Sequence, residues 1–135
     1  MATKIFVNFP VKDLKQSMNF FKQLGFTFNP QFTDETAACM KIAEDIYAML
    51  LTHDKFRQFT SKEIADATKT TEVLTCLALE SKEKVNELAD KAIAIGGTES
   101  RPAKDYGFMY QRCIDDLDGH TWEIFYMDPS AIQKG

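Results

Sequence analysis

The sequence predicts an α+β protein made of two tandem modules, each with the order strand, helix, strand, strand, strand. Two observations lead to this fold class. An apolar, β-favouring stretch at 4–11 is followed by an amphipathic helix that stops at Gly25, and the same succession recurs from 73 to 97. Three further β-favouring stretches then follow each helix. The chain is therefore predicted to contain the same βαβββ unit twice.

The first module begins with the strand at 4–11, and Asp13 is placed to open the helix as its N-cap. An apolar stripe at helical spacing gives this helix a face to bury, formed by Leu14, Met18, Phe21 and Leu24. The strands that follow are predicted at 26–31, 37–42 and 46–52.

The second module repeats this order with a helix that is longer by about one turn. Its first strand is predicted at 73–79, Ser81 begins the helix, and Gly96 and Gly97 end it. The apolar stripe of this helix is formed by Val85, Leu88, Ala89 and Ala92. The three remaining strands are predicted at 98–103, 109–114 and 121–127.

Two of the predicted strands, 46–52 and 73–79, are apolar on both faces. This pattern indicates that a helix covers one face while the other face lines an enclosed space. We therefore expect a single domain over 1–135. It contains module one at 3–53, a polar connector at 54–71 and module two at 72–128. Within the connector, a short helix near 61–67 is predicted from its Ser cap.

Composition excludes several classes of protein. The longest apolar runs of the 135 residues are far shorter than a membrane span, and no basic region followed by an apolar signal segment begins the chain, so a soluble cytoplasmic protein without a membrane partner is expected. Net charge is −4 with basic residues interleaved among acids, which gives no support for a nucleic-acid partner. Cys39, Cys76 and Cys113 are too widely spaced for a paired metal motif and are expected to be reduced.

The strongest functional signal is a carboxylate on the last predicted strand. Alternation along this strand places Glu123 on one face together with Phe125 and Met127. An acid among apolar neighbours needs a cation or several hydrogen-bond donors, because burial otherwise raises its pKa until it is protonated. Glu123 is therefore the candidate catalytic residue. The alternative is a structural carboxylate that accepts hydrogen bonds from Asn8, backbone donors or a basic side chain.

Three motifs resemble one known group of proteins. They are Val-Asn-Phe-Pro-Val-Lys-Asp-Leu at 7–14, Phe-Phe-Lys-Gln-Leu-Gly-Phe at 20–26 and Asp-Leu-Asp-Gly-His-Thr-Trp-Glu at 116–123. With them the chain resembles the vicinal oxygen chelate superfamily, which includes glyoxalase I and bleomycin-resistance proteins, and it is similar to the glyoxalase-like branch labelled predicted lactoylglutathione lyases. The resemblance implies two βαβββ modules that form a curved mixed sheet around a cavity, and a homodimer.

The resemblance also implies one metal ligand on the first strand and one on the last strand of each module. Three of these four positions hold Phe6, Leu50 and Leu74, and only Glu123 can bind a metal. One carboxylate does not supply the several nitrogen or oxygen ligands that a divalent ion requires. We therefore predict no metal and no other cofactor, with a divalent metal at Glu123 as the alternative.

The cavity is predicted to bind a small, partly apolar molecule without turnover. Its predicted ligand-binding residues are Phe6, Asn8, Leu50, Leu74, Cys76, Gln111, Cys113, Glu123 and Phe125. The alternative is a lyase or thiol transferase of the glyoxalase type that uses Glu123. A third reading is a dimeric module whose cavity has lost its function.

The remaining reactive side chains are assigned ordinary roles. Cys76 and Cys113 are expected to be inert core thiols, because no Cys-His spacing indicates an activated thiolate. His53 and His120 are expected at the end of a strand and in a turn. In the loop at 99–108, basic side chains are expected to be solvated, and closure over an anionic ligand group is the alternative.

Overall fold

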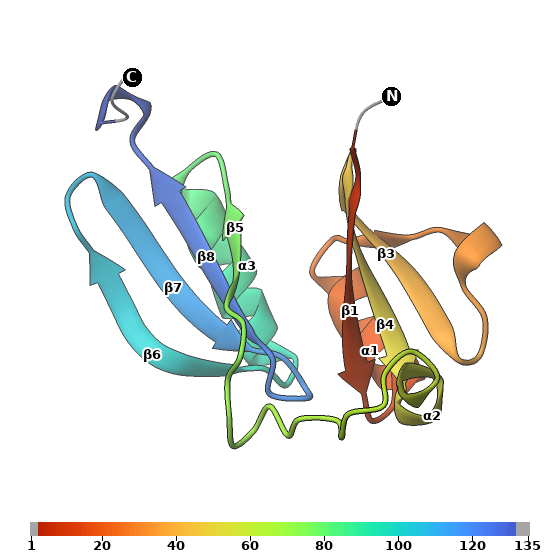
Figure 1. Ribbon diagram of the computed structural model, residues 1–135. Helices are drawn as coiled ribbons and strands as arrows, with labels where there is room; N and C mark the ends of the chain where they lie inside the picture. The colour runs from red at the N-terminus through yellow and green to blue at the C-terminus, as the bar shows by residue number, and fades with distance from the viewer. Residues whose placement is uncertain (1–2, 132–135) are drawn as a thin grey trace. The chain divides into compact units, whose positions relative to one another are not determined.

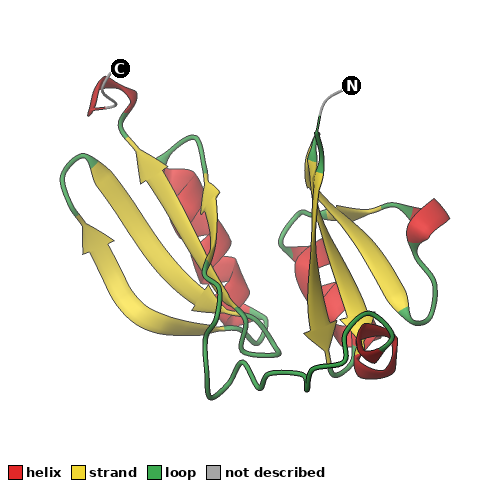
Figure 2. Cartoon of the chain, viewed as in Figure 1, coloured by secondary structure: helices red, strands yellow, loops and turns green. Residues whose placement is uncertain are grey.

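The computed structural model describes residues 3–131, and its internal contacts divide the chain between Ala65 and Asp66 into two compact units. Each unit contains a four-stranded mixed sheet with a helix against it (Figures 1 and 2). The predicted α+β class with two tandem modules is confirmed. No helix within residues 3–131 is both long enough and apolar enough to cross a membrane.

The first unit forms one sheet with the strand order β1-β4-β3-β2. Its elements are β1 (Ile5–Val11), α1 (Leu14–Gln23), β2 (Thr27–Phe28), the 3-10 helix η1 (Pro30–Phe32), β3 (Ala37–Ala43) and β4 (Ile46–Thr52). The outer strand β1 runs parallel to β4, whereas β3 is antiparallel to both of its neighbours. The parallel pair is possible because α1 and the strands after it carry the chain from the end of β1 back to the start of β4.

The helix α1 forms where the sequence predicts it. Oδ1 of Asp13 accepts a hydrogen bond from the backbone N–H of Gln16 at 3.1 Å, so the expected N-cap is present. The chain leaves the helix through Gly25 at a φ of +101°, a conformation that favours glycine. Phe20 and Phe21 are buried on the face of α1 that packs against the sheet.

The second unit forms a sheet with the order β5-β8-β7-β6, in which β5 and β8 are parallel. Its elements are β5 (Thr75–Ala78), α3 (Lys82–Ala94), β6 (Thr98–Asp105), β7 (Met109–Asp115), β8 (Thr121–Met127) and the 3-10 helix η2 (Pro129–Ala131). Ser81 caps α3 by accepting a hydrogen bond from the N–H of Lys84 at 3.1 Å. The helix packs on β7 and β8, where Trp122 and Ile124 are buried.

A buried arginine ties three elements of the second unit together. Arg112 on β7 is 8% exposed and makes a two-point contact with Glu99 on β6, with Nε 2.9 Å from Oε2 and Nη2 3.2 Å from Oε1. Its Nη1 also donates to Asp90 at 2.7 Å and to Asn86 at 3.1 Å, both on α3. This network satisfies the buried guanidinium and fixes α3 against the sheet.

Two local predictions are wrong. Residues 61–67 form no helix, because Ile64 is their only large apolar side chain and a helix there would bury little. The helix of this region is instead α2 (His53–Arg57), which Thr52 caps by accepting a hydrogen bond from the N–H of Lys55. The strand predicted at 26–31 is shortened to β2, since Pro30 has no N–H for a sheet and begins η1.

Candidate functional site

Each sheet has a face that its helix covers and an open face on the other side. In the first sheet, alternation along β4 places Ala48 and Leu50 under α1, where both are buried, and Tyr47 and Met49 on the open face, where both are partly exposed. Phe6 on β1 pairs in register with Tyr47 and belongs to the open face as well. The open face is therefore the side of this sheet that a ligand can reach.

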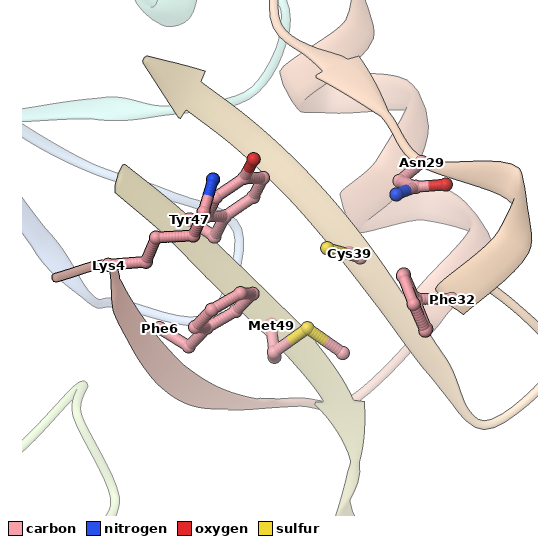
Figure 3. A pocket seen from close by; sticks show the side chains of 7 residues that line it. All are labelled: Lys4, Phe6, Asn29, Phe32, Cys39, Tyr47 and Met49. Carbon is pink, nitrogen blue, oxygen red and sulfur yellow. The ribbon is translucent and has the colours of Figure 1, made fainter. Parts of the chain in front are cut away.

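A pocket of about 370 Å³ lies on the open face of the first sheet (Figure 3). Phe6 and Tyr47 form one wall, with their rings stacked at a centroid distance of 4.6 Å and an interplanar angle of 9°. The residues that line the pocket are Lys4, Phe6, Asn29, Phe32, Cys39, Tyr47 and Met49. Most of this lining is apolar or aromatic, as is usual for sites that bind small molecules.

One positive charge lies at the edge of this pocket. The Nζ of Lys4 is 5.6 Å from the centroid of the Tyr47 ring and 3.5 Å from Oδ1 of Asp45. Tyr47 and Asp45 raise the pKa of Lys4, so the amine is a cation throughout the neutral range.

The open face of the second sheet presents a different set of side chains. Glu123 on β8 pairs in register with Cys76 on β5 and with Cys113 on β7. The Sγ of Cys76 donates to Oε1 of Glu123 at 3.0 Å, and the Sγ of Cys113 lies 3.8 Å from Oε2. Gln111 extends the row, with its Nε2 3.7 Å from the Sγ of Cys113. The carboxylate of Glu123 is thus the acceptor at the centre of a hydrogen-bonded row.

The two thiols in this row are poor nucleophiles. Burial and the neighbouring carboxylate of Glu123 raise the pKa of Cys76 to about 11, and the same two causes raise the pKa of Cys113. Both side chains are therefore protonated at neutral pH. They react slowly, because a thiol reacts through its thiolate.

The structure brings some of the predicted site residues together and separates others. Leu50 does not face the ligand side: it pairs with Phe9, is 1% exposed and lies in the core under α1. The prediction for Leu50 is therefore wrong by one residue, because the neighbouring Met49 lies on the open face of β4 together with Tyr47. Of the predicted residues, only Phe6 lines the pocket, and Asn8 is exposed two positions further along β1.

In the second unit the predicted residues share one region. Cys76, Cys113 and Glu123 are in contact, and Phe125 pairs with Gln111 beside them. Leu74 immediately precedes β5 and is 49% exposed. Of the two histidines, His53 begins α2 and His120 lies in the turn before β8.

Comparisons with known proteins agree with this architecture. Residues 3–43 match the family model described as bleomycin resistance protein-like N-terminal. A solved structure of hypothetical protein SA1046 from S. aureus is 26% identical with a TM-score of 0.79, over 93% of this chain and 95% of that one. A glyoxalase/bleomycin resistance protein/dioxygenase family enzyme from Burkholderia phytofirmans PsJN is 19% identical with a TM-score of 0.77, over 93% and 99%.

A lactoylglutathione lyase from Agrobacterium tumefaciens is 12% identical with a TM-score of 0.71, over 98% of this chain and 99% of that one. No curated protein matches the chain. The modules, their strand order and these neighbours identify the architecture. This is the vicinal oxygen chelate fold. The resemblance found in the sequence motifs is thereby confirmed.

The metal that members of the vicinal oxygen chelate superfamily use does not fit the side chains of this chain. On the open face of the first sheet, the first and last strands offer Phe6 and Met49, whose ring and thioether are no ligands for a hard divalent ion. In the second unit Glu123 is hydrogen-bonded to thiols. Within residues 3–131, no group of three or more His, Cys, Asp or Glu side chains is arranged to hold a metal ion.

Sequence reasoning missed most of the residues that line the pocket. These are Lys4, Asn29, Phe32, Cys39, Tyr47 and Met49. Tyr47 and Met49 could have been found from the pairing of β4 with β1, because residues in register on neighbouring strands share a face. Asn29 caps η1 and Phe32 is its last residue, whereas the sequence predicts a strand at 26–31 and no 3-10 helix.

Proposed function

We propose that this protein binds a small, partly apolar molecule in the pocket on the open face of the first sheet. The observation that supports this proposal is the lining: aromatic rings, a thioether and a thiol surround about 370 Å³, with one ammonium group and one amide at the edges. Pockets of this size, with few polar groups that orient a ligand, are typical of small-molecule sites. The family match over residues 3–43 covers most of the strands that build the pocket.

The experiment is a binding screen with aromatic and amphiphilic compounds, followed by thermal stability and by NMR of ¹³C-methyl methionine. A ligand that binds the folded chain raises its melting temperature. An aromatic ligand in the pocket should shift the methyl signal of Met49, assigned from Met49→Leu, while the signal of Met127 in the second unit serves as the internal reference.

A matched pair of variants locates the site. Phe32→Ala removes an aromatic side chain that lines the pocket, whereas Phe59→Ala removes one of similar exposure that does not. We expect Phe32→Ala to weaken binding several-fold and Phe59→Ala to leave it unchanged, since only the first loses contact area with the ligand. Equal effects of the two variants, or a screen in which nothing binds, would contradict the proposal.

The second candidate function is a lyase or thiol transferase of the glyoxalase type. One observation favours it: Glu123 is a partly exposed carboxylate on the open face of the second sheet, where a general base could meet a substrate. The protonated thiols beside it argue against covalent catalysis by Cys76 or Cys113.

Turnover of a hemithioacetal that is lost in Glu123→Gln and kept in the surface variant Glu35→Gln would establish the enzyme. Its metal-dependent version also requires a stoichiometric divalent metal at Glu123 in protein purified without chelator. If aromatic compounds bind to the first unit and no turnover is found, the enzyme function is excluded and the binding function remains.

The homodimer that the resemblance implies belongs to the same proposal. Sedimentation or light scattering over a range of concentrations measures the mass of the particle against the 15.4 kDa of one chain. A mass that stays at one chain at all concentrations would contradict the dimer.

A further inference from the structure

We propose that the pocket of the first unit selects a flat aromatic molecule that carries a carboxylate or another anionic group. This ligand class rests on the proposed binding function and adds the chemistry that the pocket recognises. Three features of the lining support it: the shape of the apolar walls, the sign of the single charge and the hydrogen-bonding groups that face a ligand.

The walls of the pocket favour a flat ring. The rings of Phe6 and Tyr47 stack in nearly parallel planes and form an aromatic wall, and Figure 3 shows Met49 between Phe6 and Phe32. Aromatic rings pack well against such a surface in offset or edge-on geometry, and a thioether makes favourable contacts with a ring. A flat ligand therefore gains contacts in this pocket that a flexible aliphatic chain does not.

The volume limits the size of the ligand. About 370 Å³ lies near the lower end of the range of roughly 300–1,000 Å³ for small-molecule pockets. One aromatic ring, or two fused rings with a short substituent, fits this space. Larger polycyclic molecules would extend beyond it.

Among the lining residues that belong to the described part of the chain, 3–131, the only charged side chain is a cation. Lys4 borders the pocket, and no Asp or Glu is among the lining residues. The hydroxyl group of Tyr47 donates a hydrogen bond to the backbone oxygen of Glu44 at 3.3 Å. An anionic ligand group near Lys4 is attracted to the ammonium, and a cationic one is repelled.

Lys4 already has a weak partner that a ligand can replace. Its ion pair with Asp45 is 3.5 Å long, and the two side chains are 47% and 45% exposed. Water screens a pair at such exposure, so exchanging Asp45 for the carboxylate of a ligand costs little. Asp45 should nevertheless compete, which means that removing its charge should strengthen binding of an anion.

The second polar group of the lining is a donor as well. Oδ1 of Asn29 accepts a hydrogen bond from the backbone N–H of Gln31 at 2.9 Å. This contact fixes the orientation of the amide and leaves its NH₂ group for an acceptor atom of a ligand. The ammonium group of Lys4 and the amide NH₂ of Asn29 are therefore both hydrogen-bond donors, and both can bind carboxylate or carbonyl oxygens of a ligand.

The test compares three probes with the same ring system and different charge: 2-naphthoate, 2-naphthalenemethanol and 2-naphthylmethylamine. Titration calorimetry of the full chain at low salt should give the tightest binding for the naphthoate and the weakest for the amine. We expect at least about a fivefold preference for the anion over the neutral alcohol, and a smaller one at 0.5 M NaCl because salt screens the charge.

Three variants test the role of the charge. Lys4→Gln should remove the preference for naphthoate and leave the affinity for the alcohol unchanged, whereas Asp45→Asn should increase the preference. Lys15→Gln, at an exposed position of α1 outside the pocket, is the matched control and should change nothing. The Met49 methyl signal reports whether each probe occupies the pocket and whether each variant is folded.

Each outcome decides between the two proposals. If the alcohol shifts the Met49 signal but the anion binds no better than the amine, or if Lys4→Gln keeps the preference, the ligand class is wrong and the binding function stands. If none of the probes binds and the wider screen also finds no ligand, both proposals fail.

Discussion

The thiol of Cys76 and the carboxylate of Glu123 are hydrogen-bonded across the parallel pair β5 and β8, with 3.0 Å between Sγ and Oε1. The two residues are far apart in the sequence, and the register of the strands brings them together. Partial burial of the sulfur and this contact both raise the pKa of Cys76 to about 11, so the thiol is protonated and slow to react although the residue is exposed.

Glu123→Gln should make Cys76 more reactive. The substitution removes the negative charge and the strongest acceptor, so the pKa of Cys76 should fall from about 11, although burial keeps it above the ordinary thiol value. Each unit by which the pKa of Cys76 falls gives about tenfold more thiolate, but a thiolate of lower pKa is a weaker nucleophile. The net effect is a gain of about threefold in the alkylation rate for each unit. The measurement is the rate of Cys76 alkylation by iodoacetamide at pH 8, followed by mass spectrometry.

The control for this experiment is Glu35→Gln, which removes an exposed acid of the first unit. Its Cys76 should react at the wild-type rate. An unchanged rate in Glu123→Gln as well would mean that burial alone sets the pKa of this thiol.

Much of the fold could be predicted from the sequence, because it depends on local signals. Asp13 and Ser81 cap the two long helices as expected, and Gly25 ends the first at a positive φ. The strand β8 has the predicted bounds. These features depend on a few neighbouring residues, which makes them visible in one sequence.

The candidate site was harder to predict, because it depends on register. The β4 strand is apolar on both faces, so its sequence does not show which residues face the helix. The sequence therefore predicts Leu50 as a ligand-binding residue, whereas Met49 lies on the open face. The thiol partners of Glu123 follow from the pairing of β8 with β5 and β7, which no local pattern encodes.

Arg112→Gln should destabilise the second unit by about 2–3 kcal/mol, the range for losing hydrogen bonds to charged groups in a mostly buried site. Glu99 loses both of its contacts with the guanidinium, and Asp90 on α3 loses the hydrogen bond that it accepts from Arg112 on β7. Urea unfolding monitored by Trp122 fluorescence measures the change, since this side chain is buried in the same unit.

The matched control is Arg57→Gln, because Arg57 pairs with Asp54 at a highly exposed position. An exposed ion pair adds little to stability, so the free energy of unfolding should hardly change. Equal losses in the two variants would show that the buried network of Arg112 is no stronger than a surface pair.

Two carboxyl groups of the second unit should affect stability with opposite dependence on pH. Burial raises the pKa of Asp116 above its ordinary 3.8, so this group binds its proton more tightly in the folded chain than in the unfolded one. Its contribution to stability is greatest below pH 3.8 and falls as the pH rises through the raised pKa. The stability of the wild type relative to Asp116→Asn should therefore decrease as the pH increases from 3.5 to 5.5.

Asp128 is the internal comparison, because hydrogen bonds from the backbone and side chain of Ser130 lower its pKa. Its contribution is present above pH 3.8 and is lost as the pH falls through the lowered pKa, so the stability of the wild type relative to Asp128→Asn should increase with pH. Urea unfolding at several pH values measures both differences. If the two stability differences changed with pH in the same direction, the opposite pKa shifts of Asp116 and Asp128 would be wrong.

Gly119→Ala should destabilise the second unit more than Gly107→Ala, although the two glycines have nearly the same φ, +87° and +84°. At Gly107 an added Cβ meets nothing within 4 Å, so the variant should lose only about 1 kcal/mol for the left-handed backbone. At Gly119 the Cβ would lie 2.9 Å from the backbone nitrogen of Thr68, which belongs to the connector.

The connector therefore packs against the turn before β8 at a point where only glycine fits. Because backbone atoms cannot move aside as a flexible side chain can, we expect Gly119→Ala to cost about 2–3 kcal/mol. Hydrogen exchange should in addition show faster exchange at the amide of Thr68, which donates to Oδ1 of Asp66 at 3.0 Å, in Gly119→Ala and not in Gly107→Ala. Equal losses of stability with unchanged exchange at Thr68 would mean that the connector is not held by this contact.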